Sequence, residues 1–274
     1  MQIDENILKC VFFIGLESQD GAKTSYEWRG TGFFVSRPSK LARKAFVYLV
    51  TAKHIIADIG QRNFVIRVNN KNGDSTIFNV ESGITWFFHP DESEASDVAV
   101  YPLFHTNAVL KTLDFVAISE ESLLTDLKSG QDGIGVGSDV FITGLFAFHS
   151  GTERNHPIVR MGNIAMIPTE PVPTKKFGNM EVILIESRSI GGLSGSPVFA
   201  VEKSGETPRR LMCLGLIHGH WDVPTDSILE TKQEARKYVN VGIAMVAPAR
   251  KIGETINQPK LEAIRQKMES KEDP

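Results

Sequence analysis

Gly191-Gly192-Leu193-Ser194-Gly195-Ser196-Pro197 is the most informative stretch of this 274-residue sequence. A nucleophilic serine has to present its hydroxyl from a tight turn, with free backbone N–H groups aimed at the same point. The two glycines that flank Leu193-Ser194 permit the unusual backbone angles and the close approach that such a turn needs. Taken alone, the string is equally consistent with an ordinary loop that leads into the apolar residues 198–200.

Two other short stretches carry residues that pair chemically with such a serine. His54 lies in the apolar run Val50–Ile56, which follows the glycine-flanked strand pattern Gly30–Val35. Asp97 lies near the start of a second apolar run, Ala95–Val100. Each residue also has a plainer interpretation, because a lone histidine is often a hydrogen-bonded core residue and a lone aspartate is often a turn or cap residue.

Short β-branched and aromatic runs, broken by glycine, proline and polar turns, predict an all-β protein. Ten or so strands over this length favour two barrels over one open sheet. The expected strands are Cys10–Leu16, Gly32–Ser36, Ala45–Thr51, Asn63–Val68, Asp97–Leu103, Asp139–Gly144, Glu181–Glu186, Ser196–Val201, Leu211–Ile217 and Val239–Val246.

The pattern changes after Pro248, where apolar residues recur every three to four positions among lysine, arginine and glutamate. This spacing predicts an amphipathic C-terminal helix that is broken at Pro259. We therefore expect three parts: residues 1–130 as a first barrel with a crossing segment, 131–247 as a second barrel, and 248–274 as a helical tail.

Composition indicates which kinds of partner the protein has and where in the cell it is located. A net charge of −3 gives no indication of a nucleic-acid surface or a polybasic membrane anchor. No apolar run approaches the roughly 20 residues that span a bilayer. The acidic start of the chain is unlike a signal peptide, so a cytoplasmic location is expected. Cys10 and Cys213 are expected to be buried free thiols.

His54, Asp97 and Ser194, in that order, resemble the trypsin/chymotrypsin-like serine proteases, and in particular the bacterial-type trypsin-like peptidases. The resemblance covers most of the chain. The supporting matches are Gly30–Val35 before the histidine, Gly137–Gly144 opening the second half, Val159–Ala165 as the next hairpin, and Gly242–Pro248 as the last strand.

The resemblance implies two antiparallel six-stranded-type, chymotrypsin-like β-barrels with a C-terminal helix, and a serine endopeptidase that acts on protein or peptide substrates. Ser194 would be the nucleophile, His54 the general base and acid, and Asp97 the residue that orients the imidazole. The backbone N–H groups of Gly192 and Ser194 would form the oxyanion hole. This chemistry requires no metal and no organic cofactor.

One position departs from the digestive members of that family. They carry an aspartate directly before the nucleophile, which pairs with a new N-terminus after zymogen cleavage. Leu193 stands there in this chain and has no charge for that ion pair. Activation by this switch is therefore not expected, as in many bacterial and viral relatives.

By the same resemblance, the walls of the substrate pocket contain Arg188, Ser189, His218 and His220. A basic pocket predicts cleavage after acidic or amide residues, through charge-assisted hydrogen bonds, and poor cleavage after lysine or arginine. The alternative for these residues is a solvent-facing or structural role.

Two other functions are compatible with the same residues. One is a binding module that keeps the protease fold without catalysis, since function lies in the site and not in the fold. The other is an esterase that uses the same three residues. An extended peptide that joins a strand edge is the substrate such barrels accommodate best.

Overall fold

The computed structural model describes residues 3–21, 23–41, 45–81, 84–91, 95–103, 110–127, 133–174, 177–187, 192–201, 210–224 and 238–272. The N-terminal half is an eight-stranded sheet in the order β5-β4-β1-β2-β3-β7-β6, with β8 pairing in parallel with β2. Its strands are β1 Val11–Asp20, β2 Lys23–Pro38, β3 Ala45–Thr51, β4 Phe64–Asn69, β5 Ser75–Val80, β6 Phe87–Phe88, β7 Ala99–Pro102 and β8 Ile118–Ser119.

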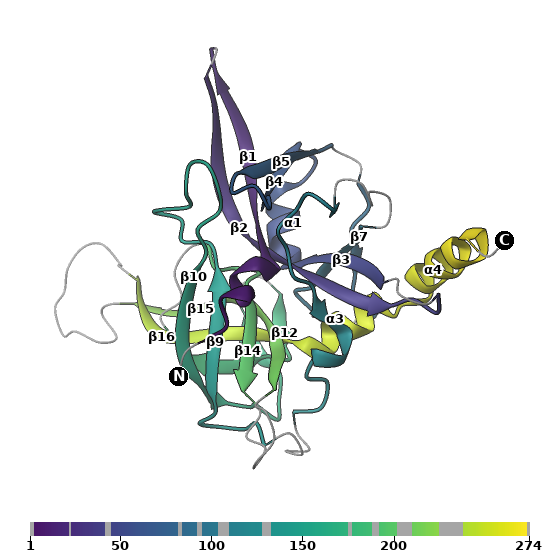
Figure 1. The fold of residues 1–274 in the computed structure, drawn as a ribbon. Coiled ribbons are helices and arrows are strands. Elements are labelled where there is room, and N and C mark those ends of the chain that lie inside the picture. The colour runs from purple at the N-terminus through teal and green to yellow at the C-terminus, as the bar shows by residue number, and fades with distance from the viewer. Residues whose placement is uncertain are drawn as a thin grey trace.

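Three short helical elements belong to this half: η1 Glu5–Cys10, α1 Lys53–Ile59 and η2 Glu120–Ser122. The β1–β2 hairpin projects well beyond the rest of the molecule (Figure 1). The first six residues of β1 are buried and the last four are exposed, so only the base of this hairpin belongs to the core.

The second half is a closed barrel in the order β10-β13-β16-β15-β14-β9. Its strands are β9 Asp139–Gly144, β10 Ile158–Met166, β13 Ile183–Glu186, β14 Pro197–Val201, β15 Leu211–Pro224 and β16 Tyr238–Pro248. A small two-stranded sheet, β11 Val172–Thr174 and β12 Gly178–Met180, lies outside the barrel ladder.

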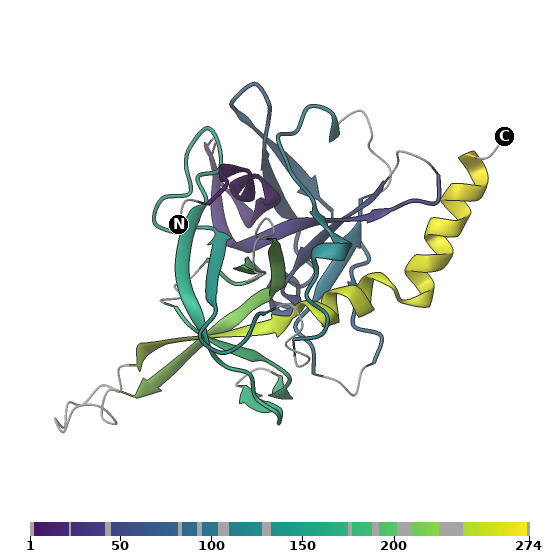
Figure 2. The same cartoon turned by 60° about the horizontal axis from the view of Figure 1, so that its bottom comes forward.

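The C-terminal helices α3 Ala249–Ile256 and α4 Pro259–Glu272 follow β16 directly. They run from the second barrel along the first half (Figure 2). Ile252, Ile256 and Leu261 are fully buried in the large hydrophobic core, which contains most of the buried apolar residues of the N-terminal half. Burial of each such side chain stabilises the fold by about 1.5–3 kcal/mol. The C-terminal tail therefore ties the end of the second barrel to the first half.

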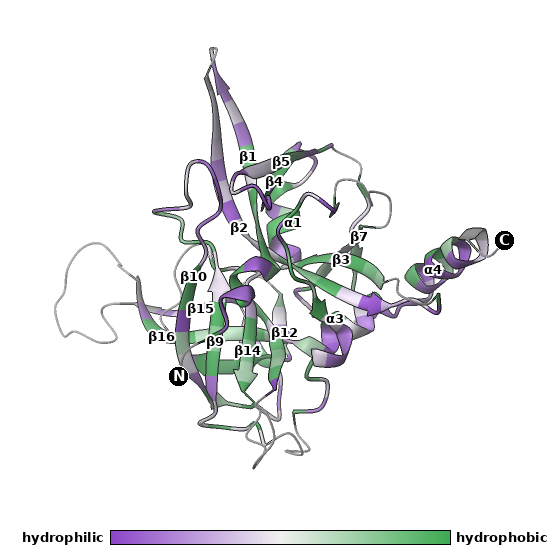
Figure 3. Cartoon of the chain, in the orientation of Figure 1, coloured by the Kyte–Doolittle hydropathy of each residue, from purple (hydrophilic) through white to green (hydrophobic). Residues whose placement is uncertain are grey.

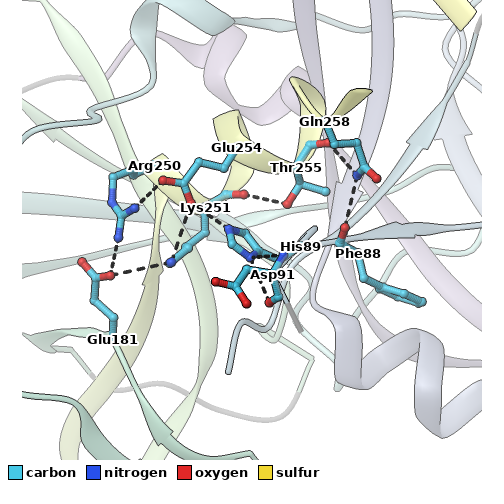
Figure 4. A network of polar contacts seen from close by, with 9 residues as sticks. All are labelled: Phe88, His89, Asp91, Glu181, Arg250, Lys251, Glu254, Thr255 and Gln258. Atoms are coloured by element: carbon cyan, nitrogen blue, oxygen red, sulfur yellow. Dashed lines mark hydrogen bonds and ion pairs between the residues drawn. The ribbon is translucent and has the colours of Figure 1, made fainter. Parts of the chain in front are cut away.

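A polar network fixes α3 to both halves (Figure 4). His89, just after β6, lies 2.7 Å from Glu254 through its Nε2. Arg250 pairs with Glu254 and, at 2.5 Å, with Glu181 of the second half. Burial lowers the pKa of the Lys251 ammonium, which lies 3.6 Å from Glu254. Burial alone raises the pKa of Glu254, but the hydrogen bond from His89 and the charges of Lys251 and Arg250 outweigh it and hold that pKa below its ordinary value.

The predicted fold class is confirmed: the chain is mostly β, with a closed six-stranded barrel and a C-terminal helix. Both halves contain strands rich in hydrophobic residues (Figure 3). Ala45–Thr51 and Asp139–Gly144 begin and end as predicted, whereas β5 was missed because it is half-buried and polar in part. The N-terminal sheet has more strands than the six expected. The boundary near residue 130 falls outside the described residues, so this division stays a prediction.

Two further expectations concern the cysteines and membrane-spanning helices. Cys10 and Cys213 are free and buried. Burial raises the pKa of both thiols, that of Cys213 to about 12. In the part of the chain that the structure describes, no helix combines the length and the apolar character needed to cross a membrane.

Candidate active site

The contact between His54 and Asp97 follows from the pairing of two neighbouring strands. Thr51 at the end of β3 pairs with Ala99 at the start of β7, so the residues beyond this pair lie side by side. The chain turns into α1 at Lys53, which places His54 in the first turn of a helix and not at the end of a strand. The side chain of His54 is 11% exposed, and that of Asp97 is completely buried.

Asp97 holds His54 through both of its carboxylate oxygens. Oδ1 accepts the backbone N–H of His54 at 2.8 Å, and Oδ2 lies 2.7 Å from His54 Nδ1. An ionised carboxylate only accepts hydrogen bonds, so Nδ1 carries the proton and Nε2 is left as an acceptor. This is the tautomer that a general base requires.

A second histidine shares the same oxygen. His218, on β15, places its Nδ1 2.6 Å from Asp97 Oδ2 and is 7% exposed. Its ring meets that of His54 edge-on at 5.7 Å, and Phe177 packs against its other side at 5.7 Å. Burial alone raises the pKa of Asp97, but hydrogen bonds from His218 and His54, together with their charge, hold it below its ordinary value.

The structure gives His218 a partner that the sequence did not predict. We expected His218 on the wall of the substrate pocket, which stays a prediction, and its ring is turned toward Asp97. The ladder between β15 and β16 has an irregularity between Ile217 and Gly219 that changes the direction of the strand at this residue. His220, two residues on, is 31% exposed and pairs with Asp222 at 3.2 Å. Arg188 and Ser189 lie outside the described residues.

Ser194 stands in a turn whose backbone is set by two glycines. Gly192 has φ +96° and Gly195 has φ +77°, values in the region that favours glycine. A Cβ at Gly195 would lie 2.2 Å from the carbonyl oxygen of Thr31, so no side chain fits there. Leu193 is fully buried in the core of the second barrel, which leaves Ser194 facing outward.

Thr31 of β2 anchors this turn to the first half. Its backbone N–H donates to the Ser194 carbonyl at 3.0 Å, and its Oγ1 donates to the Gly192 carbonyl at 3.0 Å. The same Oγ1 accepts the N–H of Leu145 at 2.9 Å. Sequence reasoning did not assign Thr31 a role, although its place between two glycines is a signal of close backbone approach.

Ser194 and His54 line the same pocket, which has a volume of about 310 Å³. Within the described residues, no hydrogen bond joins their side chains, and the backbone N–H groups of Gly192 and Ser194 make no backbone hydrogen bond. Two donors are therefore available beside the hydroxyl. The remaining residues that line this pocket are Arg29, Ile55, Asp58, Ile59 and Arg62.

His54, Asp97 and His218 also form a group whose ligand-type atoms all lie within 4.8 Å of one another. The 2.6 and 2.7 Å separations from Oδ2 to the two Nδ1 atoms are those of hydrogen bonds. A zinc ion needs about 2.0–2.1 Å to each imidazole nitrogen, with the proton removed. The arrangement accordingly fits a hydrogen-bonded cluster better than a metal centre.

Comparison with solved structures places this geometry on a known fold. The MamO protease domain from Magnetospirillum magneticum, in its apo form, is similar over 90% of this chain and 95% of its own, with 13% identity and a TM-score of 0.50. The fold is that of the trypsin-like proteases. Deg5 is similar over 83% of this chain and 88% of its own, with 16% identity and a TM-score of 0.47.

No family model matches the chain, and no curated protein matches it in sequence. Similarity at these identities extends to the trypsin-like fold alone. Any activity therefore has to be argued from the site itself.

Proposed function

We propose that this chain is a serine endopeptidase of the trypsin-like family that cleaves peptide bonds through an acyl-enzyme. The observation that carries the proposal is the arrangement around one pocket: Ser194 beside His54, with His54 held by the buried carboxylate of Asp97. Peptide substrates are favoured because a trypsin-like fold offers strand edges that an extended chain can join.

In this mechanism, Ser194 Oγ attacks the scissile carbonyl carbon while His54 Nε2 takes the hydroxyl proton. The carbonyl oxygen becomes an oxyanion that the N–H groups of Gly192 and Ser194 stabilise. His54 then gives the proton to the leaving amine, and the acyl-enzyme forms. Water attacks the ester by the same route in reverse, with His54 again acting as base and then as acid.

Asp97 has a supporting electrostatic role. It stays ionised, fixes the His54 tautomer through Oδ2, and stabilises the imidazolium that forms during each proton transfer. The lowered pKa of Asp97 is consistent with this role, because the carboxylate remains charged at neutral pH.

Covalent labelling tests the proposal. A fluorophosphonate probe should label the wild-type chain and fail to label Ser194→Ala, while Ser25→Ala, at an exposed serine of β2, should label like the wild type. A peptide library incubated with the wild type should yield cleaved peptides, and Ser194→Ala should yield none. Equal labelling of wild type and Ser194→Ala contradicts the nucleophile assignment.

Labelling without peptide cleavage, combined with hydrolysis of simple esters, favours an esterase. Absence of both labelling and cleavage favours a binding module. Within the described residues, the lack of a hydrogen bond between Ser194 and His54 is compatible with a resting enzyme, since catalytic hydrogen bonds often tighten only when substrate binds.

A further inference from the structure

A second pocket, of about 940 Å³, lies at one end of the second barrel. Three strands meet there: residues 159–163 of β10, the end of β13 with Glu186 and Ser187, and residues 240–242 of β16. It shares no lining residue with the pocket that contains Ser194.

Alternation along the strands indicates which side chains face the barrel interior. Ile164 on β10, Ile185 on β13 and Ala244 on β16 are fully buried in the second core. Side chains two residues apart share a face of a strand. Arg160, Ser187 and Gly242 therefore lie on the interior side, beyond the last apolar layer of the barrel.

Arg160 and Ser187 both carry polar atoms that lack a partner. Nε of Arg160 and Oγ of Ser187 are buried and make no hydrogen bond to any described residue, and Ser187 is only 5% exposed. Among the residues given positions in the structure, no carboxylate forms an ion pair with Arg160. A buried hydroxyl or guanidinium N–H without a partner costs free energy, so two such groups that line one pocket indicate a missing ligand.

The pocket has room for that ligand. Gly242 has φ +81°, and a Cβ placed on it would meet no atom within 4 Å, so the space in front of it is open. Glu186 is the acid of the lining, but it is exposed and lies between the inward-facing Ile185 and Ser187, so its side chain faces the other way.

We propose that this pocket binds the carboxylate of an acidic residue in a peptide. Arg160 would donate two parallel N–H groups to the carboxylate, a geometry that suits this ligand, and Ser187 Oγ would donate a third hydrogen bond. The carboxylate replaces the missing partners of both side chains. Glutamine would accept fewer of these donors and would carry no charge.

Use of this pocket in substrate selection rests on the proposed function. Met245 of β16 pairs with Gly219, the neighbour of His218. Gly242 lies three residues before Met245, which is about 10 Å along an extended strand. Ser187 precedes Ser194 by seven residues on the segment that joins β13 to β14. Strand β16 therefore connects the pocket to the neighbour of His218.

Binding is tested on the Ser194→Ala variant, so that it is measured apart from cleavage. A fluorescent glutamate-containing peptide with an amidated C-terminus is titrated by anisotropy against its glutamine twin. Arg160→Gln should weaken binding of the glutamate peptide about 10- to 100-fold, with little effect on the glutamine peptide. Ser187→Ala should weaken it in the same direction by less.

Arg210→Gln is the matched control, because it removes the same charge from an exposed position directly before β15. It should bind the glutamate peptide like the parent.

Folding of each variant is checked by thermal melting, and Arg160→Gln should melt no lower than the parent because it removes an unpaired buried nitrogen. Arg160→Lys, which keeps a charge without the planar fork, should recover part of the affinity.

The proposal is overturned if the two peptides bind with equal affinity, if Arg160→Gln binds the glutamate peptide like the parent, or if Arg210→Gln loses as much affinity as Arg160→Gln. The glutamine peptide is also tested with a free C-terminal carboxylate. If this version binds tightly, the ligand is the end of the peptide chain, and the proposal that the pocket binds an acidic side chain is overturned. Selective glutamate binding in a chain that cleaves no peptide supports the pocket and contradicts the proposed endopeptidase.

Discussion

His218 Nδ1 lies 2.6 Å from Oδ2 of Asp97, as close as the Nδ1 of His54 on the same oxygen. Two imidazoles therefore donate to one buried carboxylate oxygen, one from each half of the molecule. If Asp97 orients His54 as proposed, His218 acts through Asp97 and is a positioning residue. It restrains the carboxylate, and its own ring packs edge-on against His54 and Phe177.

His218→Ala should lower kcat/KM by about 10- to 100-fold, because a hydrogen bond to a charged group is worth roughly 1.5–3 kcal/mol and each 1.4 kcal/mol is tenfold in rate. The loss should lie in kcat, with KM little changed, since His218 does not line the pocket of Ser194. His218→Asn keeps a donor and should recover part of the rate. His149→Ala, at an exposed position outside the pocket of Ser194, is the control, and an equal effect of the two alanine variants would contradict the positioning role.

Thr31→Val tests the anchor between β2 and the turn of Ser194. The substitution keeps the shape of a fully buried side chain and removes the hydroxyl that bonds Gly192 and Leu145. It should lower the free energy of unfolding by about 1–3 kcal/mol, measured in urea, and slow labelling of Ser194. Thr143→Val is the matched control, because the buried Oγ1 of Thr143 has no hydrogen-bond partner among the described residues, so this change should be neutral or stabilising.

Gly195→Ala should prevent the turn from forming. A Cβ at this position would lie 2.2 Å from the Thr31 carbonyl oxygen and 2.5 Å from Thr51 Oγ1, in a backbone conformation with φ +77°. The expected result is little or no folded protein, seen by circular dichroism and thermal melting. Gly73→Ala shares a positive φ but meets no atom within 4 Å, so it should cost only about 1–2 kcal/mol. Similar melting of the two variants would contradict the steric argument.

Asp97 should make stability depend on pH in the acid range. Its pKa is lower in the folded chain than its ordinary value, because the hydrogen bonds from His218 and His54 outweigh burial. Between these two pKa values the unfolded chain binds more protons than the folded chain. The contribution of Asp97 to the free energy of unfolding is therefore complete above a pH of about 4 and is lost as the pH falls through the pKa of the folded chain.

The free energy of unfolding of Asp97→Asn, measured from neutral pH to pH 2, should fall less steeply below pH of about 4 than that of the wild type. Glu254 also has a lowered pKa and titrates in the same direction, so Glu254→Gln serves as a second reference. Parallel curves for wild type and Asp97→Asn would show that Asp97 does not contribute to this acid dependence.

Much of the fold was determined by local sequence pattern. Runs of β-branched and aromatic residues such as Ala45–Thr51 form strands because their side chains fill a pleated, half-buried surface. Strand β5, which is half-buried and lacks a clear alternation, gave no such signal. The glycines around Ser194 were informative for a related reason, since a required positive φ restricts the residue at that position.

Tertiary structure decided which side chains meet. His218 was expected at a pocket wall, but a register irregularity in β15 turns it toward Asp97, 121 residues away in the sequence. The bonds of Thr31 to Gly192, and the unpaired state of Arg160 and Ser187, likewise depend on strands distant in sequence. A local pattern specifies backbone conformation and burial, whereas a hydrogen bond between distant residues depends on register and strand twist, and a shift of one residue in register would reverse every side chain of the strand.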